Sequence, residues 1–338
     1  MDRRAALERW LSERYGAGAF ALAPASADAS FRRYFRVTLA GATPATLIAM
    51  DAPPEHEDCR PFIHVAGLLA DAGLNAPRIV AQDLDQGFLL LTDLGRETFL
   101  AALQDPDIDA GRTDALYADA IAALIRWQQA SRPGVLPPYD DALLRRELAL
   151  FPDWYVGRHL GVTLSAEQSA DLARVFDAIV ANNLAQPAVF VHRDYMPRNL
   201  MVSEPNPGIL DFQDAVYGPI AYDVASLFKD AFISWPEPRV IDWTVRYWEQ
   251  ARRASLPVDA DFGAFYRDFE WMGLQRHLKV LGIFARLKHR DGKAGYVEDT
   301  PRFVAYVRHV AARYNGLGPL LRLLDDLEGS MPQAGYTF

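Results

Sequence analysis

The residues best suited to chemistry lie within residues 189–214. His192, Asp194 and Asn199 follow the pattern H-x-D-x-x-x-x-N, and Asp211 comes shortly after them. Such a pattern is expected by chance only about 0.01 times in a chain of this length and composition. These four side chains are therefore the leading candidates for an active site.

The sequence around the pattern predicts that two of the four lie side by side. Residues 200–202 and 209–210 are apolar runs, and the segment rich in Pro and Gly between them predicts the turn of a hairpin. Pairing of the two runs would place Asn199 beside Asp211. An amide oxygen next to a carboxylate suits a hard divalent cation, so the pair is predicted to hold Mg²⁺ together with substrate phosphates.

Asp194 lies in the loop that leaves the predicted strand 189–191. There its carboxylate can accept a hydroxyl proton while a cation holds a phosphate, and His192 would brace the loop by hydrogen bonding. The alternative is that these residues are polar turn residues that cap two short strands. Because spacing, order and hairpin geometry agree, the pattern favours catalysis.

The elements that must position these residues change in character along the chain. An amphipathic helix is predicted at the N-terminus, and a helix at 60–72 separates four predicted strands, at 31–40, 46–50, 78–81 and 87–92. Helical patterns then dominate, at 112–130, 140–158, 166–184, 219–231, 238–254, 261–288 and 298–314. The predicted fold class is α+β, with a small β-rich lobe over 1–93 and a larger helical lobe over 94–338. A crevice between two lobes is a common ligand site.

Composition excludes several classes of protein. The chain has 338 residues and a net charge of −9, which argues against a nucleic-acid partner because nucleic-acid-binding surfaces are usually basic. No apolar run reaches the roughly 18 residues of a membrane span, and no signal peptide is visible, so no membrane contact and a cytoplasmic location are expected. The single cysteine, Cys59, excludes an internal disulfide and a cysteine-based zinc site.

The segment from His192 to Asn199, followed by Asp211, resembles the catalytic and metal-binding signature of the protein-kinase-like fold. The following Asp214, and Asp223 in Ala-Tyr-Asp-Val-Ala, resemble the small-molecule branch of that fold, the aminoglycoside phosphotransferase and choline kinase family. The resemblance covers nearly the whole chain.

This resemblance implies a two-lobed kinase that uses ATP and Mg²⁺. The lobe 1–93 would bind the nucleotide, and the lobe 94–338 would carry the catalytic loop, the metal site and the acceptor site. Asp194 and His192 would be catalytic, and Asn199 and Asp211 would be the metal ligands.

Four further stretches resemble a narrower group, the bacterial kinases that phosphorylate N-acetylmuramate and N-acetylglucosamine at C1. These stretches are 30–37, 50–55, 274–284, and Glu147-Leu148 with Phe151 and Trp154. The resemblance implies a role in peptidoglycan recycling towards UDP-N-acetylmuramate, with a small-molecule sugar as the binding partner and no obligate protein partner.

One departure from the family pattern concerns the phosphates. In this fold a lysine on the third strand usually contacts the α- and β-phosphates of the nucleotide. This chain has 31 arginines but only four lysines, and no lysine precedes Lys229. Met50 falls near the expected position. Either the chain is a nucleotide-binding module without activity, or arginine replaces the lysine through paired hydrogen bonds. The candidates are Arg33 first and then Arg32, since both lie where a loop would cover the nucleotide.

The remaining nucleotide contacts are predicted from position. The segment 26–30, which ends at Ser30, stands where a glycine-rich loop is usual, and its small side chains allow backbone N–H groups to approach phosphate. Adenine is expected at the backbone of Thr92, Asp93 and Leu94. Ile48, together with Leu91, would supply apolar walls, unless the two are simply core residues.

The acceptor site is predicted from the helical part of the chain. Trp154 offers a flat surface for a pyranose, Glu147 can accept sugar hydroxyls, and Arg276 with Lys279 can meet the lactyl carboxylate of N-acetylmuramate. The alternatives are that Glu147 pairs with a neighbouring arginine, Arg145 or Arg146, and that the basic residues form a solvated helix face.

Three functions stay open at this point. The chain is a sugar 1-kinase, a kinase of another hydroxylated metabolite or antibiotic of the aminoglycoside or choline type, or a nucleotide-binding pseudokinase.

Overall fold

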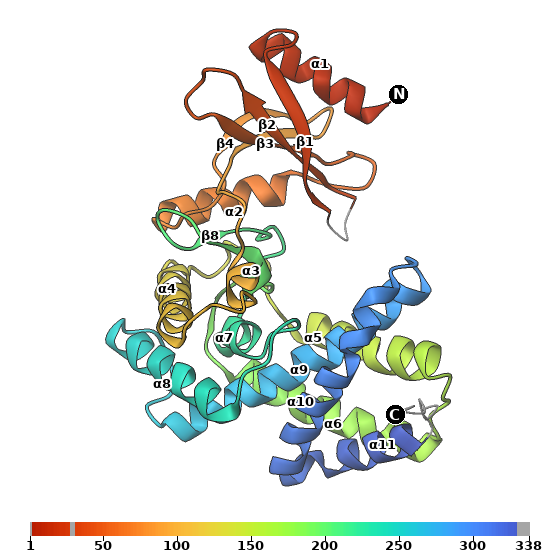
Figure 1. Cartoon of the computed structure of the whole chain (residues 1–338). Helices are drawn as coiled ribbons and strands as arrows, with labels where there is room; N and C mark the ends of the chain where they lie inside the picture. The colour runs from red at the N-terminus through yellow and green to blue at the C-terminus, as the bar shows by residue number, and fades with distance from the viewer. Residues whose placement is uncertain (1, 28–30, 330–338) are drawn as a thin grey trace. The chain divides into compact units, whose positions relative to one another are not determined.

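The computed structural model describes residues 2–27 and 31–329 (Figure 1). By its internal contacts the chain divides into two compact units. Unit 1 comprises residues 1–130 and 197–215, and unit 2 comprises residues 131–196 and 216–338. The division into lobes at 93/94 stays a prediction. None of the described helices is both long and apolar enough to cross a membrane.

Unit 1 is built around a five-stranded antiparallel sheet with the strand order β1-β2-β3-β5-β4. The strands are β1 (Phe20–Ala27), β2 (Arg33–Leu39), β3 (Thr46–Asp51), β4 (Ile79–Asp83) and β5 (Phe88–Thr92). The register places Arg33 opposite Asp51 and Ile48 opposite Leu91. Two residues predicted near the nucleotide are thereby fixed on the sheet.

Helices complete unit 1, together with a small hairpin. They are α1 (Arg3–Tyr15), α2 (Arg60–Asp71), α3 (Phe99–Leu103), α4 (Ala110–Gln129), the 3₁₀ turn η2 (Pro197–Asn199) and the hairpin strands β7 (Leu200–Met201) and β8 (Gly208–Ile209). Leu7 and Leu11 of α1 are fully buried against apolar side chains of the sheet, which explains why this amphipathic helix forms. On α2, Phe62 lies 4.7 Å from the ring of Phe212, which immediately follows Asp211.

Unit 2 is mainly helical (Figure 1, yellow-green to blue). Its elements are α5 (Asp141–Leu150), the π-helix η1 (Phe151–His159), α6 (Ala166–Ala185), β6 (Ala188–Val191), β9 (Val216–Pro219), α7 (Ala221–Phe228), α8 (Glu237–Arg253), α9 (Phe262–His289), η3 (Ala294–Asp299), α10 (Thr300–Arg313), η4 (Asn315–Leu317) and α11 (Gly318–Gly329). Helix α9, 28 residues long, packs against α5, η1, α6, α7 and α10. Most of its side chains are therefore buried, polar ones included.

The predicted α+β fold class is confirmed, and the predicted helices between residues 112 and 314 correspond to observed ones. Four helices and strands were not predicted, β1, α3, β9 and α11, and neither were the 3₁₀ turns η2, η3 and η4. β1 has the sequence FALAPASA, in which Pro and small residues weaken the strand pattern, and α3 has only five residues. Pairing with β2 stabilises β1. Whether such weakly predicted elements form depends on tertiary contacts within their unit rather than on local sequence.

Candidate active site

The hairpin of unit 1 brings two predicted metal ligands together. β7 and β8 pair with Leu200 opposite Ile209, and the Leu210 N–H donates to the Asn199 carbonyl oxygen at 2.9 Å. The Asn199 side-chain amide consequently lies beside Asp211, with 3.4 Å between Nδ2 and Oδ2. The geometric prediction for this pair is confirmed.

The surroundings of Asp211 fit a hard cation. Asp211 adopts φ 61°, a left-handed backbone conformation that is rare outside glycine. The backbone of the turn therefore sets the direction in which its carboxylate leaves the chain. Gln213 Nε2 donates to Asp211 Oδ1 at 2.9 Å, while the Gln213 Oε1 atom is buried and accepts no hydrogen bond from the described residues. An unsatisfied buried oxygen beside a carboxylate and an amide is a donor set that suits Mg²⁺.

Each of three arginines in this part of unit 1 pairs with a carboxylate. Arg32 contacts Glu57 at 3.2 Å, and Arg36 donates to Asp93 at 2.6 and 3.0 Å. Arg33 bonds to Asp51, which is fully buried and also bonded by Arg3. The guanidinium groups of all three arginines are therefore engaged by carboxylates of unit 1.

The pKa of Arg32 is influenced by a candidate metal ligand, Asp211. Burial by itself lowers the pKa of Arg32, but negative charge from Tyr34, Glu57, Asp211 and Asp214 outweighs burial and raises it. Arg33, by comparison, is 47% exposed. Asp211 is thus one of the carboxylates whose charge acts on Arg32.

The residues predicted around adenine all lie in unit 1. Ser30, predicted near the phosphates, lies outside the described residues. Ile48 is half-buried and paired in register with Leu91, which is buried. The Thr92 N–H donates to the Arg78 carbonyl at 2.9 Å, so that group is already engaged. Asp93 and Leu94 are half-buried at the end of β5.

Met50, near the position of the usual lysine, is fully buried in the sheet. Its side chain belongs to the core of unit 1.

The candidate base lies in unit 2, on the segment that follows β6. The backbone N–H groups of His192 and Arg193 donate to the Asp223 carboxylate at 2.7 and 3.0 Å. The Asp194 N–H donates to His192 Nδ1 at 3.3 Å, so His192 braces the loop as predicted. Burial raises the pKa of Asp223 to about 7, against the opposing effect of the two N–H bonds.

Four side chains converge beside this segment and form the Glu147 cluster: Glu147, Arg193, Lys279 and Tyr139. Glu147 Oε1 lies 2.6 Å from Arg193 Nη2 and 3.0 Å from Lys279 Nζ, and Oε2 accepts a hydrogen bond from the Tyr139 hydroxyl. Burial favours a raised pKa for Glu147, but Lys279 and Arg193 outweigh burial and hold the pKa below its ordinary value. Glu147 is therefore an ionised carboxylate inside a buried cluster.

The structure bears on two of the alternatives drawn from the sequence. Glu147 pairs with Arg193 and Lys279, and Arg145, one of the two neighbouring arginines considered as its partner, pairs with Asp141 and Asp177. The solvated-face interpretation of the basic residues is wrong, because Arg276 and Lys279 are 2% and 8% exposed. Helix α9 is surrounded by other helices, which a single helical pattern cannot reveal.

The four predicted acceptor residues occupy three different environments. Trp154 is half-buried on the π-helix η1, whereas Glu147 and Lys279 contact each other inside the fold. Arg276 Nη2 lies 3.5 Å from the Met196 sulfur, two residues after Asp194, and the buried Nη1 has no hydrogen-bond partner among the described residues. Sequence reasoning missed Arg193 and Tyr139 as cluster members, since no pattern in the sequence links them to residue 147.

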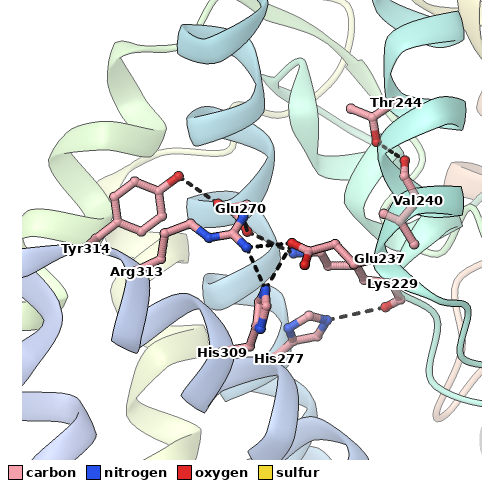
Figure 2. A network of polar contacts seen from close by, with 9 residues as sticks. All are labelled: Lys229, Glu237, Val240, Thr244, Glu270, His277, His309, Arg313 and Tyr314. Atoms are coloured by element: carbon pink, nitrogen blue, oxygen red, sulfur yellow. Dashed lines mark hydrogen bonds and ion pairs between the residues drawn. The ribbon is translucent and has the colours of Figure 1, made fainter.

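A second charged group in unit 2, the Glu270 cluster, is drawn in Figure 2. Glu270 is fully buried and contacts Arg313 at 2.9 Å, the Tyr314 hydroxyl at 2.7 Å and Lys229 at 3.7 Å. The potential ligand atoms of Glu237, Glu270 and His309 lie within 4.8 Å of one another. Because Arg313 Nη2 also contacts Glu237, and His309 at 2.9 Å, a cation already neutralises this group.

Known proteins are similar to this chain over most of its length. The chain matches the phosphotransferase enzyme family (APH) over residues 21–258. It is 56% identical over 312 residues to the N-acetylmuramate/N-acetylglucosamine kinase of Pseudomonas aeruginosa, which covers 92% of this chain and 89% of that one. The protein of the same name from Neisseria meningitidis is 47% identical over 100% of both chains. The crystal structure of aminoglycoside phosphotransferase APH(2'')-Ib with ADP bound superposes with a TM-score of 0.60 at 13% identity, over 90% of this chain and 98% of that one.

Proposed function

The chain belongs to the phosphotransferase enzyme family, and we propose that it transfers the γ-phosphate of ATP to the C1 hydroxyl of N-acetylmuramate and N-acetylglucosamine. The observation that carries the proposal is the relative named N-acetylmuramate/N-acetylglucosamine kinase, 47% identical over the whole of both chains. ADP in a phosphotransferase of the same fold supports ATP as the donor. The product would serve peptidoglycan recycling towards UDP-N-acetylmuramate, and the use of ATP supports a reaction in the cytoplasm.

In the proposed reaction Asp194 orients the sugar hydroxyl and accepts its proton. The hydroxyl oxygen attacks the γ-phosphorus in line, the bond to the β-phosphate oxygen breaks, and ADP leaves without a phosphoenzyme. An anomeric hydroxyl is more acidic than an ordinary alcohol, so proton transfer can come late. Positioning and charge neutralisation then supply most of the rate enhancement. His192 contributes by accepting the Asp194 N–H bond that shapes the loop.

Asn199 and Asp211 are the residues we propose to hold Mg²⁺. Their adjacency on the hairpin and the unsatisfied oxygen of Gln213 support this assignment. When bound, the ion supplies charge neutralisation at the phosphate oxygens. Asp194 precedes Asn199 by five positions, and a chain of that length spans at most about 18 Å, so base and metal ligands belong to one short segment.

For the phosphates we propose Arg32 ahead of Arg33. The Asp211 and Asp214 charges act on Arg32, which pairs with the half-buried Glu57, whereas Arg33 bonds to the fully buried Asp51. Adenine would bind at the backbone of Asp93 and Leu94, with Thr92, Ile48 and Ser30 as further nucleotide contacts. On the acceptor side, we propose Trp154 for the sugar ring and the free Nη1 of Arg276 for the lactyl carboxylate.

ADP release with four acceptors tests the proposal. N-acetylmuramate and N-acetylglucosamine should be phosphorylated, whereas choline and kanamycin should not. Asp194→Asn should lower kcat by about a hundredfold or more, since general-base contributions have that size. The control Asp141→Asn breaks an exposed ion pair with Arg145 and should leave kcat within twofold of wild type.

Other outcomes would identify a different function. Turnover with choline or kanamycin alone would indicate a kinase of another metabolite or antibiotic. ATP binding without turnover of any acceptor would indicate a pseudokinase. Full activity of Asp194→Asn would contradict the assigned base.

A further inference from the structure

The residue directly before the proposed base has an unusual backbone. Arg193 adopts φ 76°, in the left-handed region that residues other than glycine rarely occupy. Such a conformation persists only where the surrounding structure enforces it, and it is frequent at functional sites. The side chain and backbone of Arg193 must therefore be held by their neighbours.

Two separate carboxylates hold Arg193. The Asp223 carboxylate of α7 accepts the backbone N–H at 3.0 Å, and Glu147 of α5 accepts the guanidinium at 2.6 Å. A residue anchored at both its backbone and the far end of its side chain has little freedom to rotate. Because Asp194 follows in the chain, these anchors also set the direction of the Asp194 side chain.

Glu147 is in turn held by two further side chains, Lys279 and Tyr139, each of which is itself anchored. Lys279 of α9 contacts both Glu147 Oε1, at 3.0 Å, and the Tyr222 hydroxyl of α7, at 3.1 Å. Tyr139, which donates to Oε2, bonds through its backbone N–H to the Tyr217 carbonyl of β9 at 2.8 Å. Both carboxylate oxygens are thus engaged by protein groups.

Helix α9 reaches this cluster through a close backbone contact. A Cβ atom on Gly282 would lie 2.3 Å from the carbonyl oxygen of Leu150, at the end of α5. Glycine at this position lets α9 approach α5 closely. Lys279, one turn earlier on α9, can therefore reach Glu147.

We propose that Glu147 and Lys279 are positioning residues that hold Arg193, and through it the base Asp194, rather than residues that touch the sugar. This inference rests on the proposed kinase function. Both Glu147 oxygens are bonded by Arg193, Lys279 and Tyr139, and Lys279 Nζ contacts Glu147 and the Tyr222 hydroxyl, so both side chains are engaged by protein groups. The contacts lead instead from α5 and α9 to the catalytic segment.

The test compares Glu147→Gln with a matched variant, Glu270→Gln, which removes the charge from a buried glutamate that also contacts one arginine, one lysine and one tyrosine. Glu147→Gln should lower kcat about tenfold to a hundredfold, the size of effect that a small misplacement produces, with the KM for sugar and ATP within twofold of wild type. Glu270→Gln should leave kcat within twofold. A higher sugar KM with an unchanged kcat for Glu147→Gln would overturn the proposal, because that pattern indicates lost substrate contact.

A milder pair of variants covers the case in which Glu147→Gln does not fold. Tyr139→Phe deletes one hydroxyl from the Glu147 cluster, and Tyr314→Phe deletes one hydroxyl from the Glu270 cluster. Tyr139→Phe should lower kcat at least threefold and Tyr314→Phe should not. Equal kcat values for both variants and the wild type would contradict the proposal.

Hydrogen exchange supplies a readout that does not depend on activity. The amides of residues 189–196 should exchange at least tenfold faster in Glu147→Gln than in wild type, and at the wild-type rate in Glu270→Gln. If the wild type phosphorylates no sugar but residues 189–196 exchange faster in Glu147→Gln than in the wild type, the kinase function fails and the anchoring of this segment by Glu147 stands. If sugars are phosphorylated and exchange is unchanged, the positioning role fails.

Discussion

Two buried glutamates of unit 2 have the same kinds of partner. Each contacts one arginine, one lysine and one tyrosine: Arg193, Lys279 and Tyr139 for Glu147, and Arg313, Lys229 and Tyr314 for Glu270. A buried carboxylate needs such partners because an unpaired one would be strongly destabilising. The chemical composition of the two clusters therefore reflects burial alone.

The difference lies in the backbone that carries each arginine. Arg313 is the last residue of helix α10, so its contacts join helices. Arg193 stands in a left-handed conformation next to Asp194, so its contacts reach the segment that carries the proposed base. Residues of the same types thus stabilise the fold in one place and are proposed to position a base in the other.

The largest effect is expected where α9 approaches α5. Gly282→Ala would place a Cβ atom 2.3 Å from the Leu150 carbonyl oxygen, and the backbone must shift to relieve the contact. We expect a loss of about 3 kcal/mol in the free energy of unfolding, together with a lower kcat. Urea denaturation and steady-state kinetics measure the two effects.

The control is Gly273→Ala on the same helix, beside Lys229 of the Glu270 cluster. There a Cβ atom would meet its nearest neighbours at 3.7 Å, an ordinary contact. The higher helix propensity of alanine should leave stability unchanged or raise it by up to about 1 kcal/mol. Equal destabilisation by the two variants would show that the close approach at Gly282 has no special role.

The next largest effect is expected when each of the two arginines is replaced by methionine. Arg193→Met should lower kcat about a hundredfold, because the segment before Asp194 loses its side-chain anchor. Arg313→Met should lower the thermal unfolding temperature with kcat within twofold of wild type. Similar kcat values for the two variants would remove the distinction between the clusters.

The smallest effects are expected for the two lysines, whose pKa values are shifted in opposite directions. Burial lowers the pKa of Lys229 to about 8 from 10.5. The unfolded chain therefore holds more protons than the folded one between these values, and stability rises with pH. The unfolding free energy of wild type relative to Lys229→Met should grow by about 2 kcal/mol from pH 7 to pH 10.

Burial also acts against the charge of Lys279, but Glu147 and Tyr222 outweigh burial and raise its pKa above 10.5. Its contribution is therefore complete below pH 10.5 and declines above that value. The unfolding free energy of wild type relative to Lys279→Met should stay constant from pH 7 to pH 10. A rise as large as that for Lys229→Met would contradict the ion pairing of Lys279.

Much of the candidate site was predictable because it depends on local sequence. The hairpin and its turn follow from two short apolar runs, and they place Asn199 beside Asp211 as expected. The bracing role of His192 was also predictable, since its partner is the N–H of Asp194, two residues away. Contacts over such short separations leave the chain few alternatives.

Pairings between distant residues could not be predicted in the same way. Arg33 was expected at phosphate, yet it bonds to Asp51, its cross-strand partner on β3. The basic residues of α9 were weighed as a solvated face, yet packing of other helices against α9 buries them. A helical pattern shows which residues share a face, but not how many faces the surrounding helices cover.

The sequence by itself determined the family, the catalytic pattern and the absence of lysine before residue 229. Each of these is a matter of residue identity and spacing along the chain. Only the tertiary structure decided that the charge of Asp211 acts on Arg32 and which glutamate holds the segment of Asp194. The physical reason is that a buried charge takes its partner from whichever element packs against it, and that element can stand anywhere in the sequence.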